Sequence, residues 1–125
     1  MRILVVEDAQ YRIRTFRSEL VGHNVCVATG VQEAIVALSG EPFDAMFLDH
    51  DLGDQAYLAS EHPETVCEVV RRVGIGPFQS AQTVVIHSLN PVGARNLAAM
   101  LGRPCEVTPF HAIDWDAVRS VLDKG

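Results

Sequence analysis

The stretch Ala45-Met46-Phe47-Leu48-Asp49-His50-Asp51-Leu52-Gly53 decides the fold of this chain. It begins with an unbroken apolar run, which is typical of a strand buried on both faces of a parallel sheet. Two acids and an imidazole follow directly, where such a strand would end in a loop. Open α/β sheets place their ligand sites at this edge. The stretch therefore predicts both an architecture and the position of a site.

Other apolar runs in the chain have the same character. The expected strands cover residues 2–6, 25–28, 44–49, 83–87 and 105–108. Helical stripes lie between them, such as Val31, Ala34, Ile35 and Leu38 at the spacing i, i+3, i+4, i+7. Two connections are long, at residues 50–63 and 74–82. This alternation predicts an α/β fold, a doubly wound five-stranded parallel sheet with helices on both faces.

Length, charge and cysteine content restrict the class of protein. The 125 residues are 48% hydrophobic, which suits one domain over residues 1–125. A net charge of −6 offers no surface for duplex nucleic acid or an anionic membrane. No apolar segment approaches the ~20 residues that cross a bilayer. Three widely spaced cysteines (Cys26, Cys67 and Cys105) indicate a reducing compartment. We expect a stand-alone cytoplasmic domain.

Acidic residues form the first candidate site. Because the first and third strands of such a sheet are neighbours at the switch point, Glu7 and Asp8 should face Asp49 and Asp51. Carboxylates so close together require a hard cation, and we expect these four residues to bind Mg²⁺ or Mn²⁺. The alternative is that Asp8 caps the first helix while Asp49 and Asp51 are ordinary loop acids.

Ser88, Asn90 and Gly93 form the second candidate site, at the start of a helix that follows the fourth strand. A hydroxyl and main-chain N–H groups at a helix N-terminus suit a phosphate. The alternative is simple capping of the helix by Asn90, which needs no ligand.

Two histidines accompany these clusters. His50 and His87 could act as base and acid at phosphorus, which makes Asp49, His50, His87 and Ser88 the candidate catalytic residues. They could instead bind the metal, and His87 could also be a buried, hydrogen-bonded histidine. Since neighbouring strand residues point to opposite faces, Asp49 and His50 should diverge unless the backbone turns at once.

The residues described so far resemble those of a receiver domain, the phosphoacceptor module of bacterial two-component signalling. The resemblance covers essentially the whole chain and implies a flavodoxin-like fold with strand order 2-1-3-4-5. It implies Mg²⁺ binding by Glu7, Asp8 and Asp49 with the main-chain carbonyl of Asp51, and phosphorylation at Asp49. Ser88 matches the family's Ser/Thr after the fourth strand.

One family position differs. Thr108, before Pro109, stands where receivers carry a lysine, and Lys124 is too far along the chain to substitute for it. A phosphorylated Asp49 would therefore lack the usual charge partner.

Two motifs resemble a divergent branch, the cyclic-phosphate processing receiver domains. They are Asp-His-Asp-Leu-Gly at residues 49–53 and His-Ser-Leu-Asn-Pro-Val-Gly at residues 87–93. This resemblance implies action on a cyclic phosphate, such as a cyclic nucleotide or a nucleic-acid end. The branch usually carries an Asp-Asp pair followed by Arg, whereas this chain has Glu7-Asp8 and Gln10. Because Gln10 stands at the position of that arginine, Arg12 is the candidate to take its place.

These observations leave two classes of function open. The first is a metal-dependent cyclic phosphoesterase acting on a phosphate-containing small molecule or nucleic-acid end. The second is a signalling module. It is either an atypical response-regulator receiver that a phosphodonor phosphorylates at Asp49 in a phosphorelay, or a non-catalytic pseudo-receiver that binds a protein partner.

Overall fold

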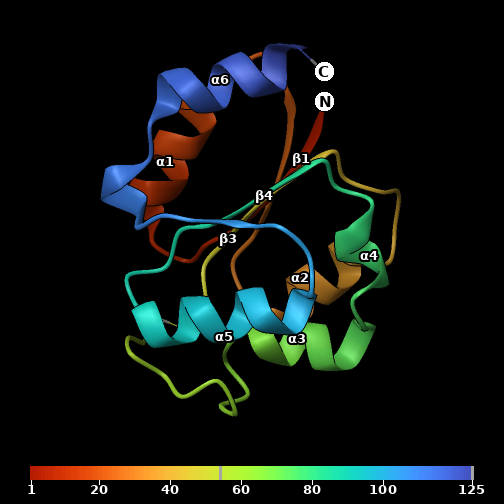
Figure 1. Cartoon of the computed structure of the whole chain (residues 1–125), viewed down its shortest axis with the longest axis vertical. Helices are drawn as coiled ribbons and strands as arrows, with labels where there is room; N and C mark the ends of the chain where they lie inside the picture. Colours follow the sequence, from red (N-terminus) through yellow and green to blue (C-terminus); the bar gives the residue numbers. More distant parts are fainter. Residues whose placement is uncertain (54, 125) are drawn as a thin grey trace.

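A computed structural model describes residues 1–53 and 55–124. Its centre is a five-stranded sheet in the order β2-β1-β3-β4-β5 (Figure 1), and every neighbouring pair is parallel. The strands are β1 (Arg2–Val6), β2 (Asn24–Ala28), β3 (Ala45–Leu48), β4 (Thr83–Ile86) and β5 (Glu106–Val107). The predicted sheet and its strand order are confirmed.

Helices cover both faces of the sheet, as Figure 1 shows. One layer contains α1 (Gln10–Glu19) and α6 (Trp115–Lys124), and the other contains α2 (Val31–Leu38), α3 (Val66–Val73) and α5 (Pro91–Leu101). A short helix, α4 (Gly76–Gln79), and a 3₁₀ turn, η1 (Phe110–Ala112), complete the regular structure that is described. None of the helices in the described ranges has the length and apolar character needed to span a membrane.

The central strands contribute to two hydrophobic cores. Ile3 and Val5 of β1 pack in the core on the side of α1 and α6, whereas Leu4 and Val6 pack in the core on the side of α2, α3 and α5. All of β3 is buried in the same alternating way. Burial on both faces explains why these strands are continuously apolar in sequence. The buried strands also determine the edge of the sheet at which Glu7, Asp8 and Asp49 follow β1 and β3.

Some element boundaries differ from the sequence expectation. The strand expected over residues 105–108 is reduced to Glu106–Val107, an exposed edge strand paired only with β4. Helix α4 lies inside the connection at residues 74–82, where it buries Phe78. In the described residues of the long connection after β3 there is no helix, and an isolated antiparallel bridge between Asp51 and Thr65 holds its two ends together.

Candidate metal and phosphate site

Side chains that follow β1, β3 and β4 meet at the carboxyl edge of the sheet and surround a cavity of about 100 Å³. Its lining contains Asp8, Arg12, Asp49, Asp51, Gln55, Ala56, Tyr57, Leu89 and Asn90. Three carboxylates and one guanidinium therefore face one small space. The acids expected to gather here from separate strands do so: Asp8, Asp49 and Asp51 line the cavity, and Glu7 lies behind them with an oxygen within 4.8 Å of Asp49.

Glu7 is fully buried and does not line the cavity. Its Oε1 accepts a hydrogen bond from His87 Nε2 at 2.9 Å and lies 3.3 Å from Arg12 Nη1. Its Oε2 accepts from the main-chain N–H groups of Asp8 and Ala9, each at 3.0 Å. Burial opposes ionisation, but the hydrogen bond and charge of His87, with smaller contributions from Ala9 and Arg12, lower the pKa of Glu7 to about 2. Glu7 thus positions Arg12 and His87, and its oxygens are not open to the cavity as expected for a metal ligand.

Asp49 is only 4% exposed. Its Oδ1 accepts the main-chain N–H of His50 at 2.8 Å, and its Oδ2 lies 3.6 Å from Arg12 Nη1. Burial, and then the charge of Glu7, raise the pKa of Asp49 to about 6, against the opposing effects of His87, the His50 amide and Arg12. The folded site therefore undercompensates the charge of this carboxylate, a condition that favours binding of a cation.

Arg12 is the cationic side chain in the cavity lining. It comes from α1, and its guanidinium carbon lies 5.4 Å from the Tyr11 ring centroid and 5.8 Å from that of Phe110. Thr108, at the position of the receiver lysine, directs its hydroxyl to Glu106 Oε1 at 3.4 Å. The positive charge at this site therefore comes from α1 rather than from the residue that follows β5.

Asp51 uses its side chain to organise the connection after β3. Its Oδ2 accepts the N–H of Tyr57 at 2.8 Å. Its Oδ1 accepts from the Leu58 N–H at 3.2 Å, Asn90 Nδ2 at 3.2 Å and His50 Nδ1 at 2.6 Å. A carboxylate with this many donors is a structural acceptor, and only the main-chain carbonyl of Asp51 is left as a candidate metal ligand.

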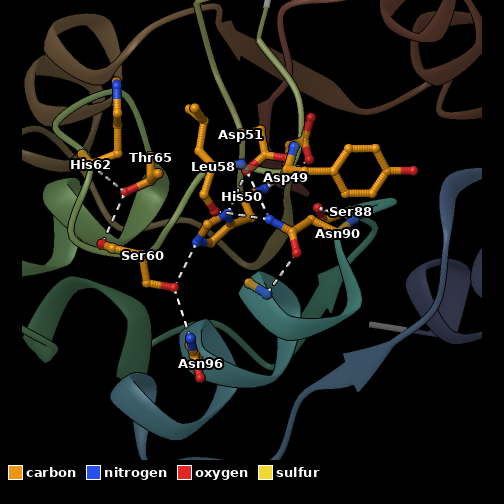
Figure 2. A network of polar contacts seen from close by, with 12 residues as sticks. Asp49, His50, Asp51, Leu58, Ser60, His62, Thr65, Ser88, Asn90 and Asn96 are labelled. Atoms are coloured by element: carbon orange, nitrogen blue, oxygen red, sulfur yellow. Dashed lines mark hydrogen bonds and ion pairs between the residues drawn. The ribbon is translucent and has the colours of Figure 1, made fainter.

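His50 does not line the carboxylate cavity, and its ring lies behind Asp51 (Figure 2). Its imidazole is fully buried between Asp51 and Ser60, with Nε2 3.0 Å from Ser60 Oγ. A Cβ atom added to Gly93 would lie 2.4 Å from His50 Nδ1, so the ring packs directly on the glycine. Asp49 and His50 diverge, as strand alternation predicted.

His87 and Ser88 also lie off the cavity lining. The His87 ring is fully buried, its centroid is 4.9 Å from that of Phe16, and its Nδ1 has no hydrogen-bond partner among the described residues. Ser88 Oγ accepts the Asn90 N–H at 3.0 Å, and Ser88 lines a separate hollow of about 250 Å³ with Val107. The prediction that His50, His87 and Ser88 surround one phosphate does not agree with the structure, because the three side chains lie in different surroundings.

Asn90 caps α5 and connects that helix to the loop. Its Oδ1 accepts the N–H of Gly93 at 3.0 Å, and its Nδ2 donates to the Leu58 carbonyl at 3.0 Å as well as to Asp51. Asn90 therefore caps α5, which is the alternative that the sequence left open for this segment. The Gly93 N–H is used by the cap and is not open to an anion.

Two sets of possible metal ligands result. Glu7, Asp49 and His87 each offer an atom within 4.8 Å of the others, but Glu7 and His87 bond to each other and Arg12 already adds a positive charge beside them. Asp8 and Asp49 instead face the cavity. Oxygen donors of this kind suit Mg²⁺ or Mn²⁺.

Two residues near His50, Ser60 and Asn96, were not among the predicted site residues. Ser60 comes from the irregular loop, and Asn96 lies on α5, where its Nδ2 donates to Ser60 Oγ at 2.9 Å. Asn96 follows Gly93 by about one helical turn, which is the one sequence signal for its place beside His50. Nothing in the spacing of the loop residues predicts which of them reaches the imidazole.

Comparison with known proteins gives a family and a set of similar folds. A family model described as the cyclic-phosphate processing receiver domain matches residues 2–103. A CheY-like response regulator receiver domain from Methylobacillus flagellatus is 20% identical with a TM-score of 0.67, covering 99% of this chain and 97% of that one.

Two further solved structures contain a metal ion. Response regulator TrrA from Thermotoga maritima, in complex with Mg²⁺-BeF, is 19% identical with a TM-score of 0.65 and coverage of 98% and 96%. The Mn²⁺-bound form of response regulator Rcp1 is 17% identical with a TM-score of 0.66 and coverage of 98% and 91%. At these identities the solved structures support the fold alone. Comparison with curated proteins gives no match.

Proposed function

Because the chain belongs to the family of cyclic-phosphate processing receiver domains, we propose that it binds a divalent cation at Asp8 and Asp49 and opens a cyclic phosphate there. The substrate is a cyclic nucleotide or a nucleic-acid end that carries a cyclic phosphate. One observation carries the proposal: Asp49, almost completely buried, faces a cavity that also receives Asp8 and Arg12.

The donor set fits Mg²⁺ or Mn²⁺. Asp8 and Asp49 supply carboxylate oxygens, and we assign the third protein ligand to the main-chain carbonyl of Asp51. The raised pKa of Asp49, about 6, reflects a charge that a cation would compensate. The Mg²⁺-BeF complex of TrrA and the Mn²⁺-bound form of Rcp1 support a cation in related receivers. When bound, such a cation polarises a phosphoryl oxygen.

The side chains around the cavity would then act on the phosphate. Arg12 binds a non-bridging phosphoryl oxygen by a charge-assisted hydrogen bond. In the reaction, water adds to phosphorus, one ring P–O bond breaks, and a proton reaches the released hydroxyl. We assign positioning roles to the two histidines because neither lines the cavity: His87 holds Glu7, which holds Arg12, and His50 holds Asp51.

The test is titration of the metal-stripped protein with Mg²⁺ and Mn²⁺ by calorimetry, with and without a 2′,3′-cyclic nucleotide, followed by chromatography of the mixture. Metal binding with ring-opened product supports the proposal. Asp49→Asn should abolish both signals, whereas Asp116→Asn, a change in a highly exposed acid on α6, should change neither. Metal binding without product would refute the reaction, and absence of metal binding would refute the whole site.

A second candidate function is phosphorylation of Asp49. The observation that favours it is Arg12, whose Nη1 lies 3.6 Å from Asp49 Oδ2 and provides a positive charge that Thr108 cannot. Incubation with acetyl phosphate and Mg²⁺ should then label the wild-type chain but not Asp49→Asn. No labelling, together with no ring opening, would leave a pseudo-receiver that binds a protein partner.

The cellular setting follows from the same features. Cys26, Cys67 and Cys105 are all unpaired, and we place the domain in the cytoplasm, where thiols stay reduced. The partner we propose is a phosphate-containing small molecule or nucleic-acid end. A phosphodonor and a protein effector would replace it under the second candidate function.

A further inference from the structure

Asp51, His50 and Ser60 form a continuous relay of hydrogen bonds (Figure 2). His50 Nδ1 lies 2.6 Å from Asp51 Oδ1, and His50 Nε2 lies 3.0 Å from Ser60 Oγ. Asp51 also accepts the main-chain N–H groups of Tyr57 and Leu58, so its carboxyl group is held as an acceptor next to the imidazole. In this arrangement His50 Nδ1 donates to Asp51 Oδ1. The Nε2 lone pair of His50 accepts the hydroxyl proton of Ser60.

The imidazole is held in this orientation. It is fully buried, and its face packs on Gly93 so closely that an added Cβ would lie 2.4 Å from Nδ1. Ser60 is half-buried and lines an open groove of about 530 Å³ between the loop and the start of α5. Ser60 is therefore the member of the relay that lines this groove, whereas the imidazole of His50 lies buried behind it.

Asn96 adds a hydrogen-bond donor at the same oxygen. Its Nδ2 lies 2.9 Å from Ser60 Oγ, and the residue is exposed on α5. An amide in this place can donate to an oxyanion that forms next to the serine. A nucleophile, a base held by a third group and an adjacent oxyanion donor are the parts needed for acyl transfer.

We propose that Ser60 is the nucleophile of a second, metal-independent site that hydrolyses neutral carboxylic esters. Ser60 Oγ attacks the carbonyl carbon while its proton passes to His50 Nε2, and Asn96 Nδ2 donates to the carbonyl oxygen as it becomes negative. The C–O bond to the alcohol breaks, and the alcohol leaves with the proton held by His50. Water then attacks the acyl-serine by the same route, which releases the acid and restores Ser60.

The walls of the groove indicate the substrate class. Leu58, Pro91 and Val92 supply apolar surface, and Glu61 is the charged side chain in the lining. With a carboxylate and no cation among its lining residues, the groove disfavours phosphate esters and anionic acids. A neutral ester is the electrophile that fits. Asp8, Arg12 and Asp49 take no part, so this site goes beyond the proposed phosphate chemistry.

A cysteine also approaches the serine. The thiol of Cys67 is fully buried close to Ser60. Burial raises the pKa of Cys67, against the lowering effect of the Arg71 charge. The thiol therefore stays protonated at neutral pH and does not compete as the nucleophile.

The test uses the whole chain in EDTA, so that the metal site has no influence on the result. We expect a fluorophosphonate probe to modify Ser60, located by peptide mass spectrometry, and p-nitrophenyl acetate to give a burst of p-nitrophenol. Ser60→Ala should remove both signals. Ser39→Ala is the matched control and should keep them, because Ser39 is an exposed serine whose hydroxyl donates to the Ile35 carbonyl of its own helix.

Variants of the supporting residues separate catalysis from folding. His50→Gln should slow labelling by ~10²-fold or more. Asn96→Ala changes an exposed residue, so it should fold normally and slow labelling by ~10²- to 10³-fold. A folded wild-type chain without modified Ser60 would overturn the proposal, as would labelling of Ser60 at an unchanged rate in Asn96→Ala.

Discussion

Replacement of Asp49 by asparagine should stabilise the metal-free protein at neutral pH. The ordinary pKa of an aspartate is 3.8, and that of Asp49 in the fold is about 6, raised by burial and then by Glu7. Below about pH 4, Asp49 is protonated in both the folded and the unfolded chain, so its raised pKa does not lower the free energy of unfolding. As the pH rises from about 4 to about 6, the unfolded chain releases its proton first, so stability falls.

The size of the effect follows from the shift. A difference of about 2 pKa units at about 1.4 kcal/mol each gives ~3 kcal/mol of destabilisation above about pH 7. Asparagine cannot ionise and keeps the Oδ1 acceptor for the His50 N–H. Asp49→Asn should therefore raise the free energy of unfolding by ~3 kcal/mol at pH 8 and leave it almost unchanged at pH 3.5.

The assay is urea denaturation in EDTA, followed by circular dichroism, for wild type and variant over that pH range. The difference between the two proteins reports the ionisation of Asp49 beside Glu7, whose charge contributes to the raised pKa of Asp49. The control, Asp116→Asn, should alter stability by less than ~0.5 kcal/mol at every pH. A difference between wild type and Asp49→Asn that is independent of pH, or a variant less stable than wild type at pH 8, would refute the reasoning.

Three other predictions concern the same region. The Mg²⁺ affinity of the wild-type chain should rise between about pH 5 and pH 7 and then level off, as calorimetry can show, because Asp49 must lose its proton to bind the cation; a flat profile would contradict the assigned pKa. Gly93→Ala should lower stability by ~1–3 kcal/mol in thermal unfolding because its methyl group would meet the His50 ring, whereas Gly76→Ala, with no atom within 4 Å of the added carbon, should not. Arg12→Ala should destabilise the chain by ~3 kcal/mol at pH 7, since it leaves Glu7 and Asp49 without their shared cation; a smaller loss than in Arg14→Ala would argue against that role.

The fold was predictable because its signals are local and repeated. Runs such as residues 45–48 are short and apolar at every position, which is typical of strands buried on both faces of a sheet. Helix α4 escaped prediction because Gly76 and Pro77 carry little helical preference, and burial of Phe78 against the rest of the chain decides its conformation. The expected fifth strand was too long because an edge strand lacks a second neighbour that would extend its pairing.

The candidate site was predictable in outline but not in detail. Strand ends placed Asp8 and Asp49 at one edge of the sheet, and alternation separated Asp49 from His50. The sequence could not show that Glu7 turns inward to His87, because the choice between two adjacent acids depends on the buried partner that each one finds. The position of Ser60 could not be predicted either, because an irregular loop has no repeating pattern that indicates where a side chain points.

The carboxylate of Asp51 joins segments that are distant in sequence: the loop at Tyr57 and Leu58, and the helix cap at Asn90. Ordering a residue costs ~1–2 kcal/mol of backbone entropy, and here that cost is met when the chain folds. A ligand that enters the cavity therefore finds its wall already in place. Its affinity reflects its own contacts and desolvation, without a further penalty for closing a loop over it.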